Sequence, residues 1–260
     1  MSNSSQYVFG GISGMFGVLL SHPLDTIKTH IQTGNKLNTF KPNILNLYKG
    51  ISIPLMGVGI EKAIVFGTYN YTLQITESIP LSGAIAGLTA SLIVSPYERL
   101  KILKQSSKSF TVKDIINHRF LFKGLSVTFT REVPGFAIYF SVYEKLKYET
   151  FTKHNKEITA SSSFLYGGLS GLTAWIFIYP QDKIKTIIQS NNNSSTNYSL
   201  LGNSINKIVK NIYNEKGLSD IFKHFYKGFN WAAGRAILLH SGTFCMMEAL
   251  NGKTVLDTIY

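Results

Sequence analysis

The stretch PLDTIKTHIQ, residues 23–32, decides the fold because its pattern occurs three times in the chain. A proline is followed by an acid after two positions, a lysine after five and a glutamine after nine. The other copies are PYERLKILKQ, residues 96–105, and PQDKIKTIIQ, residues 180–189. Each copy ends an apolar segment and is followed by an aromatic-Lys-Gly triplet, at residues 48–50, 122–124 and 226–228. Three copies in the same order indicate three repeats of one two-helix unit.

The composition indicates a membrane protein. Of 260 residues, 44% are hydrophobic and only 15% are charged, yet the net charge is +12. Lysine and arginine interrupt apolar segments and do not gather on one face, so basic loops near anionic lipid headgroups are favoured over nucleic-acid binding. The single cysteine, Cys245, excludes a disulfide within the chain.

Six segments have about the length that a bilayer requires of a helix. They cover residues 7–32, 51–75, 81–105, 125–147, 163–189 and 229–250. Each carries ionisable residues, and a charge at the centre of a bilayer costs at least about 2.5 to 3.5 kcal/mol unless it faces a partner or water. We therefore expect an all-α membrane protein whose six transmembrane helices surround a polar interior. The single domain, 1–260, would contain repeats at approximately 1–78, 79–158 and 159–260.

Small residues four positions apart precede each motif copy. These pairs are Gly10 and Gly14, Gly83 and Gly87, and Gly167 and Gly171. This spacing lets two helices approach closely, so we expect tight helix contacts at these points.

The thrice-repeated motif resembles the signature of the mitochondrial carrier family, and the resemblance covers essentially the whole chain. It implies a multi-pass solute transporter of the mitochondrial inner membrane that works by alternating access. It also implies short helices on the matrix side, a monomer, a small-molecule substrate and contact with membrane lipids such as cardiolipin, with no nucleic-acid partner. The Asn- and Ser-rich segment 190–199 is expected to lie in solvent on the matrix side.

The motif also has a physical basis of its own. Proline kinks a helix, and the acid, the lysine and the glutamine lie on one helical stripe. Where three stripes converge, the acids can pair with lysines of neighbouring helices and the glutamines can brace the pairs; in the family this ring is the matrix gate. Its members would be Asp25, Lys28, Glu98, Lys101, Asp182 and Lys185, with Gln32, Gln105 and Gln189 as braces. The alternative is that each acid pairs with the lysine of its own helix.

A second gate is expected at the cytosolic ends of the even-numbered helices, where the family shows an aromatic-acid-x-x-Lys/Arg motif. The second repeat keeps this motif as Tyr143, Glu144 and Lys147. In the first repeat the two charged positions hold Asn70 and Leu73. In the third repeat they hold Glu248 and Asn251. At most one full ion pair can form there, so we expect the matrix gate to be the stronger one and the empty carrier to rest open toward the intermembrane space.

Charges on the even-numbered segments are the candidate substrate-binding residues. Arg131 and Arg235 each lie seven residues after a triplet glycine, and Glu132 follows Arg131. Glu61 lies one helical turn beyond the equivalent position of the first repeat. The two arginines suit a substrate carboxylate, and Glu61 and Glu132 suit ammonium groups, as in a zwitterion with an extra cation. The alternative is that the four charges only neutralise one another.

Three further residues lie close to these positions in the sequence. Lys62 either extends to water or pairs with Glu61, and the second case would weaken the role of Glu61. His240 and Trp231 are expected to be packing or cavity-wall residues, with ligand binding as the alternative.

The fourth segment narrows the expected substrate. Its stretch REVPGFAIYFSVYE, residues 131–144, resembles the basic amino acid (ornithine) carriers and the related carnitine/acylcarnitine carriers. Glu61 favours the first branch, whose members have an acid at this depth. We expect exchange of ornithine, arginine or lysine. The alternatives are carnitine/acylcarnitine exchange and a regulatory protein that keeps the carrier fold without transport.

The sequence does not indicate an enzyme. Its six histidines are His22, His30, His118, His154, His224 and His240. They include no pair at metal-binding spacing within one helical turn, Cys245 stands alone, and glycine-rich phosphate-binding loops are missing. We therefore expect no catalytic residues, no metal and no cofactor.

Overall fold

A computed structural model describes residues 3–32, 44–48, 50–105, 122, 125–154, 159–190, 225–226 and 228–251. Its long helices are α1 (Asn3–Gln32), α3 (Ser52–Thr76), α4 (Ile79–Gln105), α7 (Leu125–His154), α8 (Ala160–Ser190) and α11 (Phe229–Asn251). A short helix, α2 (Ile44–Leu47), lies between α1 and α3 in the chain. The described residues contain no strand, so the expected all-α fold with six long helices is confirmed. The six expected segments coincide with these helices, and α7 extends furthest beyond its segment, to His154.

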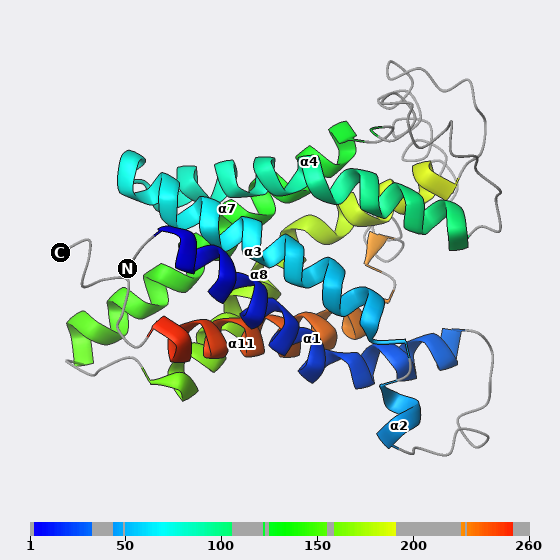
Figure 1. The fold of residues 1–260 in the computed structure, drawn as a ribbon, viewed down its shortest axis with the longest axis horizontal. Coiled ribbons are helices and arrows are strands. Elements are labelled where there is room, and N and C mark those ends of the chain that lie inside the picture. The colour runs from blue at the N-terminus through cyan, green and yellow to red at the C-terminus, as the bar shows by residue number, and fades with distance from the viewer. Residues whose placement is uncertain are drawn as a thin grey trace.

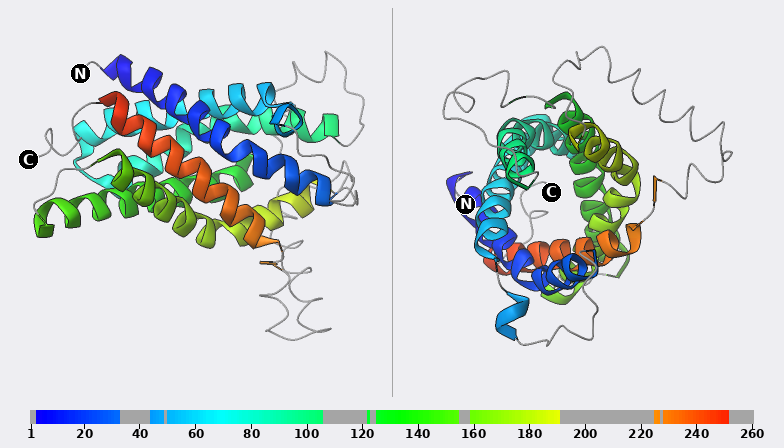
Figure 2. Two further views of the ribbon diagram at one scale, coloured as in Figure 1. Left: turned by 90° about the horizontal axis from the view of Figure 1, so that it is seen from below. Right: turned by 90° about the vertical axis from the view of Figure 1, so that its right-hand side faces the viewer.

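The six long helices run along the length of the bundle in Figure 1 and form a closed ring. Each contacts the next in the order α1, α3, α4, α7, α8, α11, and α11 contacts α1. The view along the bundle in Figure 2 shows this ring, with α2 outside it. We call the end where α1 begins and α11 ends the termini end. The motif copies end α1, α4 and α8 at the opposite end, which we call the motif end.

The ring has apolar side chains on its outside and polar ones within. Large apolar side chains are exposed, among them Leu88, Leu92, Leu165, Leu169 and Phe177. Charged side chains are buried, among them Lys62, Glu132, Glu144 and Lys147. This distribution is the reverse of that in a water-soluble protein and suits a bilayer. By length and apolar composition alone, two described segments, Ser4–Ile27 and Ile79–Pro96, are suited to cross a membrane.

The first glycine of each pair lies where the two helices of a repeat meet. A Cβ atom added at Gly10, Gly83 or Gly167 would lie 2.6, 2.7 or 2.6 Å from a backbone oxygen of the partner helix. These oxygens belong, in the same order, to Lys62, Phe136 and His240. No side chain fits at such a distance, so the expected close approach is confirmed in all three repeats.

The motif prolines lie inside α1, α4 and α8 and each deprives one carbonyl oxygen of its helical donor. In α1 the oxygen four residues before the proline belongs to Leu19, which accepts a hydrogen bond from the Tyr48 hydroxyl (3.2 Å). In α8 the equivalent oxygen of Ile176 accepts one from the Tyr226 hydroxyl (2.8 Å). The triplet tyrosines thus compensate for the prolines. The second repeat has Phe122 in this place, which has no hydroxyl group to donate.

The triplet glycine forms the turn into the even-numbered helices. Gly50 and Gly228 have φ angles of +83° and +86°, in the left-handed region that favours glycine. The next residue, Ile51 or Phe229, donates its N–H to the carbonyl oxygen of the triplet tyrosine at 3.3 or 3.0 Å. This turn fixes where α3 and α11 begin, and therefore the height of every residue on them.

Candidate functional site

Residues at the same distance from the triplet glycine occupy equivalent positions in α3, α7 and α11. Seven residues after it stand Gly57, Arg131 and Arg235, which we call the arginine layer. Both arginine side chains are partly buried. Each reaches an acid of the proline motif on the next helix around the ring.

Arg131 joins α7 to α8. Its Nη1 lies 2.8 Å from Oδ1 of Asp182, the acid of the third motif copy. Its Nη2 contacts Oε1 of Glu132, the next residue in the chain. Hydrogen bonds between a guanidinium and a carboxylate are strong and directional, so this cluster holds Arg131 in a defined orientation.

Arg235 joins α11 to α1 in the same way. Its Nε lies 2.7 and 2.9 Å from the two carboxylate oxygens of Asp25, the acid of the first motif copy. Two equivalent arginines therefore bind two equivalent acids. The first repeat has Gly57 at this place, so α3 offers no arginine for a third contact of this kind.

Glu61 lies one turn closer to the termini end and forms an ion pair with Lys62, at 3.6 Å. The Glu61 side chain is 25% exposed, whereas that of Lys62 is only 3% exposed. The Lys62 ammonium also lies 4.6 Å from the ring centre of Phe136 and 5.3 Å from that of Tyr139. The sequence left two alternatives for Lys62, extension to water or pairing with Glu61. The structure shows the pair with Glu61, so extension to water is wrong.

The expected ring of motif ion pairs is visible only in part. Asp25 and Asp182 are described, and both bind residues of the arginine layer. The other expected members lie outside the side chains that the structure describes: Lys28, Gln32, Glu98, Lys101, Gln105, Lys185 and Gln189. Their pairing stays a prediction. Sequence reasoning missed the arginine contacts of the two acids, because those contacts depend on the relative heights of neighbouring helices.

The residues expected at the cytosolic gate come together at the termini end. The Lys147 ammonium lies 3.5 Å from the Glu248 carboxylate and 5.3 Å from the ring centre of Tyr143. Glu144 is buried, and its Oε2 has no hydrogen-bond partner. Among the described residues this gate therefore has one ion pair between helices.

Gln6 of α1 connects two positions at which the gate motif has lost its charges. Its amide nitrogen donates to Oδ1 of Asn251 at 3.0 Å, and its amide oxygen accepts a hydrogen bond from Asn70 at 3.3 Å. The three amides link α1, α3 and α11. Sequence reasoning missed Gln6 because this residue lies in the first turns of α1, outside every motif.

Aromatic side chains fill the centre of the ring below this gate. Phe66, Phe140 and Phe244 each lie sixteen residues after a triplet glycine, and we call them the phenylalanine ring. Their ring centres are 5.5, 5.6 and 6.3 Å apart in edge-to-face contact. Tyr69 stacks on Phe140, and Tyr143 stacks on Phe244. All five side chains are buried.

The termini end is closed in this structure. The space among the phenylalanine ring and the gate charges is about 20 Å³, which holds about one water molecule. The structure is therefore a closed state at this end, and the expectation that the empty carrier rests open there stays a prediction. Counting ion pairs underestimated the gate, because packed aromatic residues outside the charged motif close it.

A further layer lies between the arginine layer and the phenylalanine ring. Lys62, Phe136 and His240 each follow a triplet glycine by twelve residues, and we call them the middle layer. His240 is buried, and its Nδ1 lies 3.1 Å from the Tyr139 hydroxyl. Trp231, near the start of α11, is 42% exposed.

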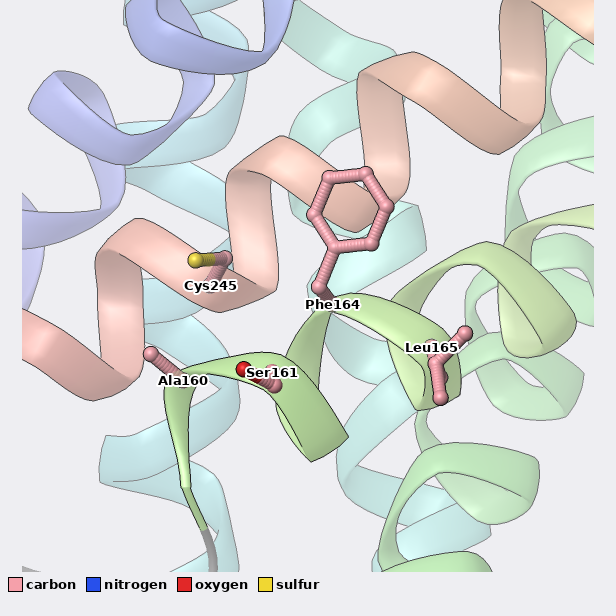
Figure 3. Close-up of a pocket in the computed structure, with 5 residues that line it drawn as sticks. All are labelled: Ala160, Ser161, Phe164, Leu165 and Cys245. Atoms are coloured by element: carbon pink, nitrogen blue, oxygen red, sulfur yellow. The ribbon is translucent and has the colours of Figure 1, made fainter.

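A shallow pocket of about 440 Å³ lies between the start of α8 and the end of α11 (Figure 3). It is lined by Ala160, Ser161, Phe164, Leu165 and Cys245. The side chain of Leu165 is 63% exposed, which puts the pocket on the outer surface of the ring. Its lining contains no charged residue, so it suits a zwitterionic solute less well than the arginine layer does.

In the part of the chain that the structure describes, six long helices in three equivalent pairs, with apolar side chains outside and charged side chains within, define a solute carrier with internal threefold symmetry. The sequence profile of the family described as mitochondrial carrier protein matches the chain three times, over residues 1–79, 76–154 and 156–255. The chain belongs to the mitochondrial carrier family, and it is a solute carrier.

Relatives in this family have different named solutes. The chain is 30% identical to a mitochondrial glycine transporter of Saccharomyces cerevisiae, over 92% of this chain and 88% of the relative. It is 31% identical to the mitochondrial basic amino acids transporter of Homo sapiens, over 71% of each chain. It is 27% identical to the mitochondrial carnitine carrier of Saccharomyces cerevisiae, over 95% of this chain and 86% of the relative. The names of the relatives therefore do not define one solute for this chain.

Proposed function

We propose that the chain exchanges cationic amino acids, namely ornithine, arginine or lysine, across the mitochondrial inner membrane by alternating access. The observation that carries this proposal is that Arg131 and Arg235 occupy equivalent positions of the ring, with Glu132 beside Arg131 and Glu61 one turn further toward the termini end. In this proposal the chain is a multi-pass monomer, contacts cardiolipin among the surrounding lipids, and moves its substrate without a chemical step.

Each part of the substrate has a matching group. Guanidinium groups bind carboxylates through paired, charge-assisted hydrogen bonds, which assigns the substrate carboxylate to Arg131 and Arg235. Glu132 would accept hydrogen bonds from the α-ammonium group. Glu61, about 6 Å further along the helix axis at 1.5 Å per residue, would bind the cation at the end of the side chain. Buried charges of this kind usually serve transport, because their burial is costly.

The contacts of the two arginines supply a link between binding and the gate at the motif end. A substrate carboxylate that binds the arginine layer competes with Asp25 and Asp182 for the guanidinium groups. The displaced acids would then be available to the motif lysines, and the motif ring would form beneath the substrate. Substrate binding would in this way favour the state that is closed at the motif end and open at the termini end.

A second candidate substrate is an amino acid without a charged side chain. Lys62 neutralises Glu61 at 3.6 Å, which leaves Arg131, Glu132 and Arg235 for one carboxylate and one ammonium group. The name of the glycine transporter among the relatives is consistent with this reading. Carnitine, the alternative from the sequence, also has a carboxylate, and a relative is named for it. Its quaternary ammonium has no N–H to donate to Glu132, so the site suits it less well.

The test is uptake into liposomes that contain the purified chain. The liposomes are preloaded with ornithine, glycine, carnitine or nothing, and labelled arginine, glycine or carnitine is supplied outside. We expect arginine to enter only in exchange for an internal basic amino acid. Glu61→Gln should abolish this uptake. Glu77→Gln, a matched change of an exposed carboxylate between α3 and α4, should leave it unchanged.

The other outcomes have defined meanings. Exchange of glycine without arginine would support the neutral amino acid, and exchange of carnitine alone would support the carnitine carrier. No flux with any of the three solutes would favour the regulatory, non-transporting protein.

A further inference from the structure

Lys62 is a buried cation that neither the gate motifs nor the arginine layer accounts for. Its ammonium lies 3.6 Å from the Glu61 carboxylate, 4.6 Å from the centre of the Phe136 ring and 5.3 Å from that of Tyr139. A carboxylate together with aromatic faces is a chemically complete site for an organic cation. We call Glu61, Phe136 and Tyr139 the cation cage.

The surroundings hold the cage in place. The Tyr139 hydroxyl lies 3.1 Å from Nδ1 of His240, which fixes the tilt of the tyrosine ring. The stem of Lys62 runs against α1 at Gly14, where an added Cβ would lie 2.7 Å from the Lys62 side chain. The glycine therefore makes room for the lysine. Residues of α1, α3, α7 and α11 all contribute to this arrangement.

The position of the cage suits a substrate group better than a gate residue. It lies on the motif-end side of the phenylalanine ring, in and beside the middle layer, one turn from the arginine layer. Lys147, the buried cation of the gate, lies on the opposite side of the phenylalanine ring and pairs with Glu248. Glu61 is also 25% exposed, so the cage has one open side.

We propose that the cation cage is the subsite for the side-chain ammonium or guanidinium of the substrate, and that Lys62 occupies this subsite when the carrier is empty. Lys62 has the same terminal group as a lysine substrate and reaches the cage on a flexible four-carbon stem. It acts as a tethered competitor that the substrate displaces. This inference rests on the proposed transport of cationic amino acids.

Two consequences follow for binding. The apparent affinity for a cationic substrate is lowered by the fraction of molecules in which Lys62 fills the cage. A neutral side chain gains nothing by displacing Lys62, because Glu61 would then face the site without a cation. Lys62 therefore lowers the affinity for a cationic substrate and leaves the affinity for a neutral one unchanged.

The test compares L-lysine with L-norleucine, whose side chain has a methyl end in place of the ammonium. Binding to the purified full chain in detergent is measured from the ligand dependence of its melting temperature. Lys62→Met keeps the length of the side chain and removes its charge. We expect this variant to bind lysine about tenfold more tightly than the unmodified chain and to bind norleucine with unchanged affinity. Lys62→Gln serves the same purpose if the methionine variant does not fold.

Two variants separate this role from a purely structural one. Lys62→Arg keeps a cation in the cage and should leave lysine binding as in the unmodified chain. Phe136→Leu, combined with Lys62→Met, removes one aromatic face and should reverse the gain for lysine without affecting norleucine. Equal changes for lysine and norleucine, or weaker lysine binding in Lys62→Met, would overturn the inference.

The liposome assay distinguishes a failure of the tethered competitor from a failure of the proposed function. If the unmodified chain exchanges basic amino acids but Lys62→Met does not bind lysine more tightly, the tethered competitor is wrong and the proposed function stands. If the unmodified chain does not exchange basic amino acids but Lys62→Met binds lysine selectively, the cage stands and the proposed substrate is wrong.

Discussion

Arg235 on α11 and Asp25 on α1 are joined by two short contacts, 2.7 and 2.9 Å from Nε to the carboxylate oxygens. One residue belongs to the candidate substrate site and the other to the proline motif, 210 positions away in the chain. The contact therefore joins the last helix of the ring, α11, to the first, α1. Arg131 and Asp182 repeat it between α7 and α8, so the link between site and motif occurs at two equivalent places of the ring.

Asp25→Asn should separate binding from transport. Without the carboxylate, Arg235 is available to the substrate, so KM for arginine exchange should fall, by about tenfold for a competing charge-assisted contact. The same change removes an acid of the motif ring, so the maximal rate should fall as well. Concentration-dependent uptake into liposomes measures both quantities.

The equivalent change and the opposite change serve as controls. Asp182→Asn should act in the same direction through Arg131. Arg235→Ala removes the partner of the substrate itself and should raise KM by about tenfold to a hundredfold. A rise in KM for Asp25→Asn would contradict the competition between this acid and the substrate.

Phe244→Ala should loosen the closed termini end. Phe244 makes edge-to-face contacts with Phe66 and Phe140 and stacks on Tyr143. Truncating a buried phenylalanine costs about 3 to 5 kcal/mol of packing, and we expect the open state to lack the packing that the closed structure has here. The closed population should therefore decrease.

A thiol at the gate measures this change. In a Cys245→Ser background, Met247→Cys places a thiol at a buried position of the same end. We expect a membrane-impermeant thiol reagent to modify it faster when Phe244→Ala is also present. Leu165→Ala, on the exposed outer surface, is the matched control and should not change the rate. Equal rates with and without Phe244→Ala would show that the phenylalanine ring does not close this end.

The fold could be predicted from the sequence because the pattern of the two-helix unit occurs three times in the chain. One proline motif would be weak evidence, but three copies with their triplets and paired glycines locate every long helix. Gly10 and its equivalents illustrate this, since their contacts with Lys62 and its equivalents differ by only 0.1 Å among the repeats. The sequence pattern within one repeat was sufficient to predict the helices, because each repeat buries the same helix faces in the same way.

The site was only partly predictable. Arg131, Glu132 and Arg235 stand out because charges are rare in apolar helices. Their partners Asp25 and Asp182 could not be assigned from the sequence. The closed ring determines which helices are neighbours and how far each is shifted along the bundle axis relative to the next. The phenylalanine ring was missed because three phenylalanines look like ordinary packing residues. Their common spacing from the triplet glycine was the signal that would have found them.

Asn251→Lys should strengthen the gate at the termini end. Asn251 and Glu144 line the same small space, and Oε2 of Glu144 has no hydrogen-bond partner there. A lysine would give this buried carboxylate a partner, at the loss of the hydrogen bond between Gln6 and Asn251. A hydrogen bond to a charged group contributes about 1.5 to 3 kcal/mol and exceeds the neutral bond that is lost.

The melting temperature of the detergent-solubilised variant should therefore rise, and the maximal exchange rate should fall, because a more stable closed end opens less often. Asn251→Met has a similar length without a charge and should lower the melting temperature instead. If Asn251→Lys and Asn251→Met shift it equally, the gain does not come from a pair with Glu144.

Tyr226→Phe should destabilise the part of α8 around Pro180. The hydroxyl of Tyr226 is the donor to the Ile176 oxygen, which the motif proline leaves without its helical partner. Losing one hydrogen bond costs about 1 kcal/mol, or a fall in melting temperature of about 2 to 4 °C. Tyr48→Phe should have the same effect through Leu19. Tyr71→Phe, on the exposed face of α3, is the matched control and should change little.

Phe122→Tyr tests the same contact in the opposite direction. The second repeat has the proline but not the hydroxyl, and the N–H of Leu125 donates to the Phe122 oxygen at 3.0 Å, as the equivalent groups do in the other two repeats. If the three repeats are equivalent here, the added hydroxyl reaches the oxygen of Leu92 and raises the melting temperature by about as much as Tyr226→Phe lowers it. An unchanged melting temperature would mean that the second repeat satisfies its proline in another way. Equal effects of Tyr226→Phe and Tyr71→Phe would contradict the role of the triplet tyrosines altogether.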